Sequence, residues 1–417
     1  MLTIQSKSDG YKTFIEGGML EIIGRAHEER GSYRMAIAFF EEKLQFLDMR
    51  EDSDDDHLVE QVAETLNSLG MLSCRAGLYL EAIDYYDRAL EIQMKFGCDP
   101  VQLAMARVLA GSVQHSLGHY KKALKLFQDA IKTLRELVGP EQETVAATLF
   151  HMGVVRGSLC EYDDAMKHLQ DALTMQKKLL GGEHPATLRT RREVANLFAV
   201  YPAELDSALN EYDEILSVQE LIHGEKHPNV AETLHSIGCA QARKGDFSVA
   251  LRTLEDCYNM RLEFLGMDHP LQATTLHEIA KIHLKRGRLK KALHICDSAL
   301  TIRVESLSEQ HIDVAVTMVT KASCLVAKNN FADANRVFCE ALSIADKAVG
   351  SMHPSVADIY VQMGTMHLRK CHFEEASNAM KKALDIYRAS NLDDDHPAIK
   401  EAKKELQRVE RAEMLCV

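Results

Sequence analysis

The stretch VAETLHSIGCAQARKG (230–245), followed by FSVALRTLEDCYNMRLEFLG (247–266), decides the fold. In both segments apolar residues recur about every three to four positions, the spacing of one face of an α-helix. Gly245 closes the first segment, and glycine allows the tight reversal needed between antiparallel helices. The small side chains of Ala250 and Cys257 let two helix backbones approach closely, while larger residues fill the gaps beside them. The two segments therefore predict a helix–turn–helix unit.

This unit recurs along the chain with a period of about 42 residues. The clearest marker is an alanine, found at Ala36, Ala82, Ala123, Ala165, Ala208, Ala250, Ala292, Ala334 and Ala376. Three positions before each alanine stands a large residue, namely Tyr33, Tyr79, Tyr120, Tyr162, Leu205, Phe247, Leu289, Phe331 and Phe373. A glycine five positions before the alanine marks the turn at Gly31, Gly77, Gly118, Gly245 and Gly287. Self-similarity at a fixed period of this length is the signature of a repeat array.

A histidine marks the beginning of the later units, at His184, His227, His269, His311, His353 and His396. All but His311 are followed by proline. Proline suits the first turn of a helix, because the N–H that it lacks would have no partner there. We therefore expect a first helix to begin after each histidine, and the histidine itself to cap the helix or to pack in the preceding loop.

The small–large–small pattern resembles the tetratricopeptide repeat, whose usual period is 34 residues. The longer period is similar to that of kinesin light chain and nephrocystin-3 repeats, which carry a long second helix, a Leu-Gly and a His-Pro. Segments such as ALTMQKKLLGGEHPATL (172–188) and ALSIADKAVGSMHPSVADIYVQMG (341–364) carry this resemblance, which extends over about residues 57–397. It implies an all-α fold in which stacked helix pairs form a right-handed superhelix with the first helices on the concave face.

The pattern predicts a domain organisation with an N-terminal tail (1–16), a repeat array (17–389) and a C-terminal capping helix (390–417). The fifth unit is degenerate, because Tyr201 and Pro202 replace the clean turn. The array contains nine units, which begin near Gly17, His57, Asp99, Glu141, His184, His227, His269, His311 and His353.

Composition and motifs exclude several classes of function. The net charge of −13 argues against nucleic-acid binding, which needs a basic face to displace counterions from phosphates. No stretch approaches the roughly 20 apolar residues of a membrane-inserted helix, and the N-terminus lacks the apolar core of a signal peptide. The ten cysteines form no CxxC pair, so we expect neither a metal site nor another cofactor, and reduced cysteines in a cytoplasmic protein. No HExxH, Walker A, GxSxG or GxGxxG motif is present, so we expect no catalytic residues and no enzyme activity.

Candidate binding residues lie on the first helices. His235 and His277 occupy the same position in adjacent units, on the face that looks into the groove of a tetratricopeptide fold. Several lysines and arginines on first helices form either a basic strip, which would suit an acidic peptide, or isolated surface charges. Kinesin light chains line this groove with Asn-Asn pairs, of which only one asparagine is retained here. The candidate peptide-binding residues are Asn67, Arg75, His235, Arg243, His277, Lys281, Lys285, Gln362 and Arg369.

The sequence therefore predicts a scaffold or adaptor that binds a peptide segment of a partner protein in the concave groove. One alternative is a structural or regulatory module that assembles with itself through its edges or its convex face, which makes a homo-oligomer possible. An enzyme is a third hypothesis, which no motif supports. The partner's identity does not follow from the sequence.

Overall fold

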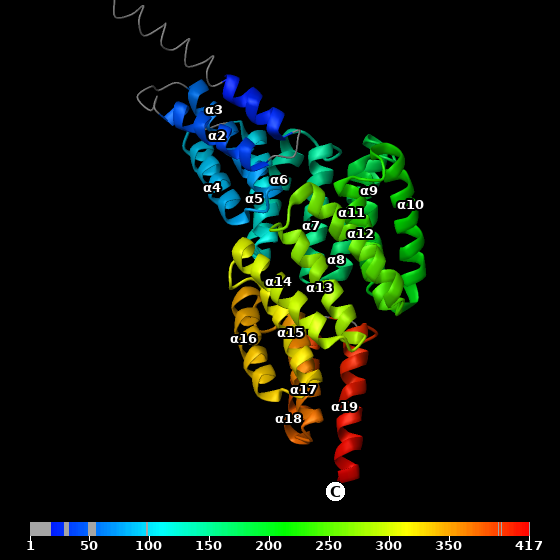
Figure 1. Ribbon diagram of the computed structural model, residues 1–417. Coiled ribbons are helices and arrows are strands. Elements are labelled where there is room, and N and C mark those ends of the chain that lie inside the picture. Colours follow the sequence, from blue (N-terminus) through cyan, green and yellow to red (C-terminus); the bar gives the residue numbers. More distant parts are fainter. Residues whose placement is uncertain are drawn as a thin grey trace, which may run out of the picture. The chain divides into compact units, whose positions relative to one another are not determined.

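The computed structural model describes residues 18–28, 33–48, 56–96, 99–390, 392 and 394–416, and their regular structure is all helical (Figure 1). The prediction of an all-α repeat fold is confirmed. After a helix over residues 18–28, the helices are α2 (Tyr33–Asp48), α3 (Asp56–Arg75), α4 (Tyr79–Phe96), α5 (Pro100–Ser116), α6 (Tyr120–Leu137), α7 (Glu143–Ser158), α8 (Tyr162–Leu179), α9 (Pro185–Phe198), α10 (Leu205–His223), α11 (Pro228–Lys244), α12 (Phe247–Leu265), α13 (Pro270–Lys285), α14 (Leu289–Leu307), α15 (Ile312–Ala327), α16 (Phe331–Val349), α17 (Pro354–Arg369), α18 (Phe373–Ala389) and α19 (Pro397–Cys416).

The helices form two compact units, each with its own apolar core. Unit 1 contains the described residues within 1–117 and 121–148, and unit 2 contains residues 118–120 and the described residues from 149 onward. Figure 1 shows the succession of helix pairs in unit 2, from α9 and α10 in green to α17 and α18 in orange. Most of the candidate binding residues lie in unit 2.

The two helices of each pair pack through small side chains. In the pair α11–α12, Ala250 and Cys257 have no exposed surface. Gly238 of α11 faces Leu254 of α12, and a Cβ atom at this glycine would lie 2.6 Å from Leu254 Cγ. The first helix therefore supplies a small residue where the second helix places a large one, so the two helices approach closely.

Histidine caps the first helices of the later repeats. In α11, the Nδ1 atom of His227 accepts a hydrogen bond of 3.1 Å from the backbone N–H of Asn229, which would otherwise have no partner at the helix end. The same bond recurs at His184, His269, His311, His353 and His396. The expected capping role is confirmed, and it requires an unprotonated Nδ1.

A left-handed residue joins the first helix of most pairs to the second. Gly287 has φ = 71°, and other glycines of this turn are also left-handed. Cys160, Asn329 and Cys371 take the same conformation at the equivalent positions, with φ between 58° and 61°. The fifth repeat departs from this pattern, because α9 ends at Phe198 and a 3₁₀ turn over Pro202–Glu204 precedes α10.

Distant repeats of unit 2 meet through two of the capping histidines. The Nδ1 atom of His353 accepts the capping bond, so its Nε2–H donates to the backbone oxygen of Ser158 at 3.2 Å. The His396 ring stacks on Tyr162 with a centroid distance of 5.5 Å, and Tyr201 meets it edge-on at 6.0 Å. The turns of the fourth and fifth repeats thus contact the N-termini of α17 and α19, which restrains the arc of helices between them.

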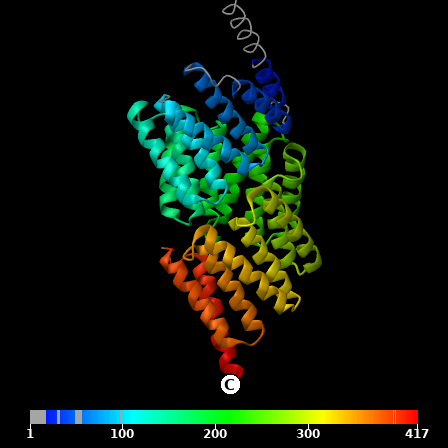
Figure 2. The same cartoon turned by 90° about the vertical axis from the view of Figure 1, so that its left-hand side faces the viewer.

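The helix α19 covers the end of unit 2. Its residues Ile399, Ala402 and Val409 have no exposed surface, and the helix packs mainly on α18, as seen at the red end of the chain in Figure 2. The opposite face of α19 is charged and includes Lys403, which pairs with Asp394. A single amphipathic helix thus closes an array that would otherwise expose apolar surface.

The effect of the left-handed turn residues on stability can be tested by substitution. We expect Gly287→Ala to lower the unfolding free energy by about 1 kcal/mol, because a Cβ atom disfavours positive φ. Cys371→Gly, at the equivalent exposed turn position, should leave stability unchanged or raise it. Thermal unfolding followed by circular dichroism measures both variants. Equal losses of stability in the two variants would show that the left-handed strain is not the cause.

Candidate functional site

The first helices form the inner layer of unit 2. Successive first helices α9, α11, α13, α15 and α17 contact one another, whereas successive second helices in the described residues make no comparable contact. A stack of pairs that is closer on one side than on the other must curve, and the close side is concave. The candidate site is therefore built from the exposed faces of these five first helices, here called the inner face.

Two rows of polar side chains run across the inner face, at positions that repeat with the period of the array. Most of them are half-buried, and each helix contributes one residue to each row. The first row is Glu193, Ser236, Glu278, Thr320 and Gln362, and the second row is Asn196, Cys239, Lys281, Ser323 and Thr365. The inner face thus offers regularly spaced hydrogen-bonding groups.

An ion-pair network joins α9 to α11 at the edge of these rows. Arg192 is buried and pairs with Glu232 of α11 and with Glu193 of its own helix. Burial raises the pKa of Glu232, but the charge and the hydrogen bond of Arg192 outweigh this effect and lower the pKa overall. Asn196 donates to Glu193 at 3.0 Å and accepts from the Tyr212 hydroxyl at 2.7 Å. These bonds hold the polar groups of α9 in fixed orientations.

The two histidines predicted to face the groove lie next to a second ion pair. Burial lowers the pKa of both His235 and His277 to about 3, so each is neutral at physiological pH. Lys281 bonds both carboxylate oxygens of Glu278, at 2.9 and 3.0 Å. Burial raises the pKa of Glu278, but the nearby Lys281 charge more than offsets it and the pKa falls to about 2. The Sγ atom of Cys239 lies 3.5 Å from His235 Nε2.

The cations that could form either a basic strip or isolated surface charges have partners within the chain. Arg243 donates to the backbone oxygen of Ala199 at 2.9 Å, and Arg369 donates to that of Val326 at 3.1 Å. In each case an arginine near the C-terminal end of one first helix donates a hydrogen bond to a backbone carbonyl at the C-terminal end of the preceding first helix, where that carbonyl lacks a helical partner. Lys285 lies over the Phe247 ring at 5.8 Å. With Lys281 paired to Glu278, the inner face is charge-balanced rather than basic.

The remaining predicted residues are divided between the two units. Gln362 lies on the inner face of unit 2 and accepts a hydrogen bond of 3.3 Å from the Ser323 hydroxyl. Asn67 and Arg75 lie on α3 in unit 1, where Arg75 pairs with Glu28 at 2.8 Å. The Asn67 Oδ1 atom is buried and finds no hydrogen-bond partner among the described residues. A role in binding stays a prediction for all nine residues.

A set of polar residues that hold neighbouring helices in position was not predicted from the sequence. Thr233 donates to Gln219 at 2.7 Å, and Arg261 donates to Thr275 at 2.7 Å and to the backbone oxygen of Leu271 at 2.8 Å. Each pair joins a second helix to the next first helix, and the threonine stands six positions after the capping histidine. The same threonine recurs at Thr190 and Thr317, where its partners are Gln176 and Arg303. That periodic threonine is the signal that could have revealed them.

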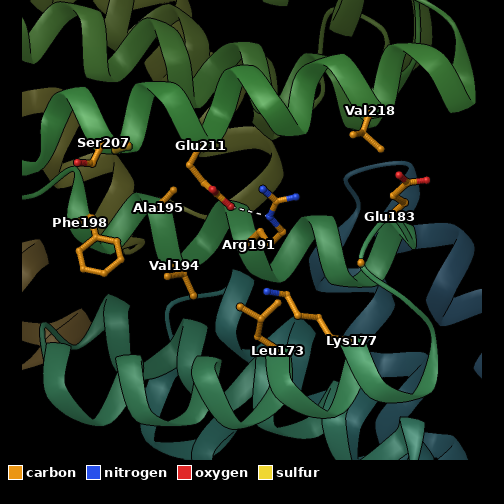
Figure 3. A pocket seen from close by; sticks show the side chains of 12 residues that line it. Leu173, Lys177, Glu183, Arg191, Val194, Ala195, Phe198, Ser207, Glu211 and Val218 are labelled. Atoms are coloured by element: carbon orange, nitrogen blue, oxygen red, sulfur yellow. Dashed lines mark hydrogen bonds and ion pairs between the residues drawn. The ribbon is translucent and has the colours of Figure 1, made fainter.

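A cleft lies on the other side of the layer, between α8 and α10. Its volume is about 670 Å³, and α9 forms its floor (Figure 3). Phe198 stands at one end of the cleft and Glu183 at the other, with Val194 between them. Arg191 rises from the floor and bonds Glu211 of α10 at 2.6 Å. This α8–α10 cleft contains both an apolar surface and carboxylates.

Two other properties concern the described residues as a whole. They contain no group of three or more histidine, cysteine, aspartate or glutamate side chains placed to hold a metal ion. None of their helices is long and apolar enough to cross a membrane.

The sequence pattern of the tetratricopeptide repeat matches residues 61–136, 203–263 and 271–347, and a second pattern of the same repeat matches residues 158–186. These matches cover more than half of the chain, which therefore belongs to the tetratricopeptide repeat family. Chains of this family are generally protein-interaction scaffolds. No curated protein sequence matches the chain.

Two similar solved structures with TM-scores above 0.5 support the same fold. The Rap conjugation gene regulator of plasmid pLS20, in complex with the Phr* peptide, has a TM-score of 0.56 and 14% identity, over 95% of this chain and 96% of that one. A Rap protein complexed with Competence and Sporulation Factor has a TM-score of 0.55 and 13% identity, over 96% and 98%. Repeats of a putative kinesin light chain from Podosopora anserina have 19% identity and a TM-score of 0.40, over 50% and 98%. The prediction of a tetratricopeptide repeat protein is confirmed.

The buried histidines make stability depend on pH. His277 is 5% exposed and has a pKa of about 3 in the folded chain, against about 6.5 when solvated. Below pH 6.5 the unfolded chain binds a proton that the folded chain does not, so stability is full above pH 6.5 and falls as the pH drops from there toward 3. Between pH 7 and pH 5 this group should cost about 2 kcal/mol. Urea unfolding of the wild type and of His277→Gln at both pH values measures it, and an equal loss in both proteins would contradict the assignment.

Proposed function

We propose that this protein is an adaptor that binds a peptide segment of a partner protein on the inner face of unit 2, and that it is not an enzyme. The observation that carries the proposal is the pair of polar rows contributed by five successive first helices. Such a surface matches the repeating backbone of an extended peptide, or one face of a helix, over several residues. The cytoplasmic location stays a prediction.

The chemistry of the inner face favours recognition by hydrogen bonds. Its cations are paired, as Lys281 is with Glu278 and Arg192 with Glu232. An acidic peptide would have to displace these carboxylates from their cations, so the charges of the inner face do not favour an acidic ligand. The amide and hydroxyl groups of Asn196, Ser323 and Gln362 can instead bond to peptide backbone and to polar side chains.

The comparisons support a peptide ligand in general terms. Two of the similar structures that extend over nearly the whole chain hold a peptide or a competence and sporulation factor. Their sequence identity to this chain is low, so the ligand of this chain and its contacts rest on the inner face itself.

Substitution on the inner face tests the proposal. We expect Ser323→Arg to weaken partner capture at least about tenfold, because the long cation fills the second polar row between two helices. Arg252→Glu on the exposed side of α12 is the matched control and should leave capture unchanged. Capture is measured by affinity purification with mass spectrometry and then by titration of the captured partner. Equal affinity of Ser323→Arg and the wild type would place the partner elsewhere.

Crosslinking locates the contact independently. A photoreactive amino acid in place of Thr365, at the end of the second row, should crosslink to the partner. The same group in place of Arg252 should not. The opposite pattern would move the binding surface to the second helices.

A further inference from the structure

A run of positive charge joins α13 to α14. The segment IAKIHLKRGRLKKALHIC (279–296) contains six lysines and arginines and no aspartate or glutamate, in a chain whose net charge is −13. Lys281, near its beginning, pairs with Glu278. The other five are exposed at the end of α13, in the turn and at the beginning of α14, and are here called the basic turn: Lys285, Arg286, Arg288, Lys290 and Lys291. Because these side chains are exposed, packing within the helix pair does not account for them.

The charges of the basic turn lie close together and are not neutralised by the chain. In the described part of the chain, the lysines and arginines from Arg286 to Lys291 form no ion pair. His283, near the end of α13, is 1% exposed, and neither of its ring nitrogens has a hydrogen-bond partner among the described residues. Its pKa is lowered to about 4, first by burial and then by the charges of Lys291, Arg288 and Arg286. The cations therefore act together on one buried, unpartnered ring, and this part of the surface lacks a negative group.

The beginning of α14 carries a charge that opposes the helix dipole. Backbone N–H groups give the N-terminal end of a helix a partial positive charge, which favours acidic residues in the first turn. In α8 and α18 the two positions after the first residue hold Asp163–Asp164 and Glu374–Glu375. In α14 the same positions hold Lys290 and Lys291, and no side chain caps the helix. The N-terminus of α14 is thus electrostatically unfavourable by itself, and a bound carboxylate would stabilise it.

The neighbouring turns extend the positive charge into a short row. Lys244 and Lys328 are exposed at the position equivalent to Arg286. The helices α11, α13 and α15 contact one another in this order, and packed helices lie about 10 Å apart. The three cations therefore span about 20 Å, which is the length of about six residues of extended chain. Lys244 pairs with Asp206, but an exposed ion pair of this kind contributes little and can exchange its partner.

Carboxylates limit the width of this row. Asp246 and Asp333 lie in the neighbouring turns, at the positions equivalent to Arg288 and Lys291. A membrane surface or a nucleic acid presents negative charge over a wide area, and it would be repelled by these carboxylates and by a chain of net charge −13. A short polypeptide segment can instead lie along the row. The arrangement therefore favours an acidic peptide over a larger polyanion.

We propose that the basic turn binds a short acidic segment of a partner protein. Arg286 and Arg288 present guanidinium groups, which bond carboxylates through two parallel N–H donors. Lys290 and Lys291 add charge at the N-terminus of α14, where a carboxylate also meets the helix dipole. The opposite charges bring the partner to this surface and select it over neutral or basic segments. The basic turn lies at the C-terminal end of α13, beyond the polar rows of the inner face, so the two surfaces are separate.

Binding is tested with two labelled peptides of about 12 residues, twice the length of the row. In one peptide glutamates alternate with serines, and in the other glutamines replace the glutamates. Fluorescence anisotropy with the full chain at about 50 mM salt should show a Kd of about 100 µM or tighter for the glutamate peptide, and at least about tenfold weaker binding of the glutamine peptide. Raising the salt to about 300 mM should weaken the first complex several-fold, because salt screens exposed charges. Equal affinities, or no binding of the glutamate peptide, would overturn the proposal.

Charge reversal locates the binding. Lys290→Glu with Lys291→Glu should lower the affinity for the glutamate peptide at least about tenfold. The fold should accept both glutamates, because α18 has them at these positions, and thermal unfolding checks it. Lys121→Glu with Lys122→Glu is the matched control, because α6 begins with two lysines at the equivalent positions after a turn without lysine or arginine. The control should bind like the wild type. Wild-type affinity in the α14 variant, or an equal loss in the α6 control, would refute the site.

Two further measurements separate this surface from its alternatives. Glu278→Gln with Lys281→Gln removes the ion pair of the inner face and should leave binding of the glutamate peptide intact. A loss there would assign the peptide to the inner face and overturn the proposal. Vesicles that contain phosphatidylserine and a single-stranded RNA, each at the same concentration of negative charge, should bind more weakly than the peptide. If either binds more tightly, and Lys290→Glu with Lys291→Glu abolishes that binding, the occupant is a polyanion of that class and not an acidic segment.

Discussion

In each repeat the second helix lies against its own first helix through a small side chain, and the rest of the structure depends on this close approach. Ala250, like the equivalent alanines in the other second helices, has no or almost no exposed surface. A larger residue one turn later, such as Leu254, then fits against a glycine of the first helix. Because a Cβ atom at Gly238 would overlap Leu254, the sizes of the residues at these two positions depend on each other. This packing defines the pair, and stacking of pairs builds the layer that carries the inner face.

Stacking between pairs relies on polar groups that have little exposure to water. Capping histidines close the N-termini of the later first helices, and Gln–Thr or Arg–Thr bonds join the second helices α8, α10, α12 and α14 to the next first helix. Buried polar groups of this kind stabilise a structure only when their partners are in place, so they favour one register of stacking over others. His353 and His396 have an additional role, because they also contact the turns of the fourth and fifth repeats. Their rings link repeats that are far apart in the sequence of unit 2.

The inner face and the α8–α10 cleft, which this packing leaves accessible, differ in their chemistry. The inner face is polar and charge-balanced, since its arginines and lysines satisfy carboxylates and helix-end carbonyls inside the chain. The α8–α10 cleft combines apolar side chains with equal numbers of cations and carboxylates in its lining. A cleft of the same kind lies between α14 and α16 over α15, where the repeat is regular.

The amino-acid sequence by itself determined the helix pairs, their period and the tetratricopeptide family, because these depend on local spacing: alanine and glycine where helices approach, and histidine with proline where they begin. It also marked the fifth repeat as irregular. It could not show that Arg243 and Arg369 bond to carbonyls of the preceding repeat, because these partners are more than 40 positions away in the sequence. Nor could it show which partner Lys281 takes, although Glu278 lies only three positions away on the same helix. A row of cations therefore suggested a basic strip that the folded chain neutralises. Only the tertiary structure decided which polar groups remain available on the inner face, since this follows from how neighbouring helices pack.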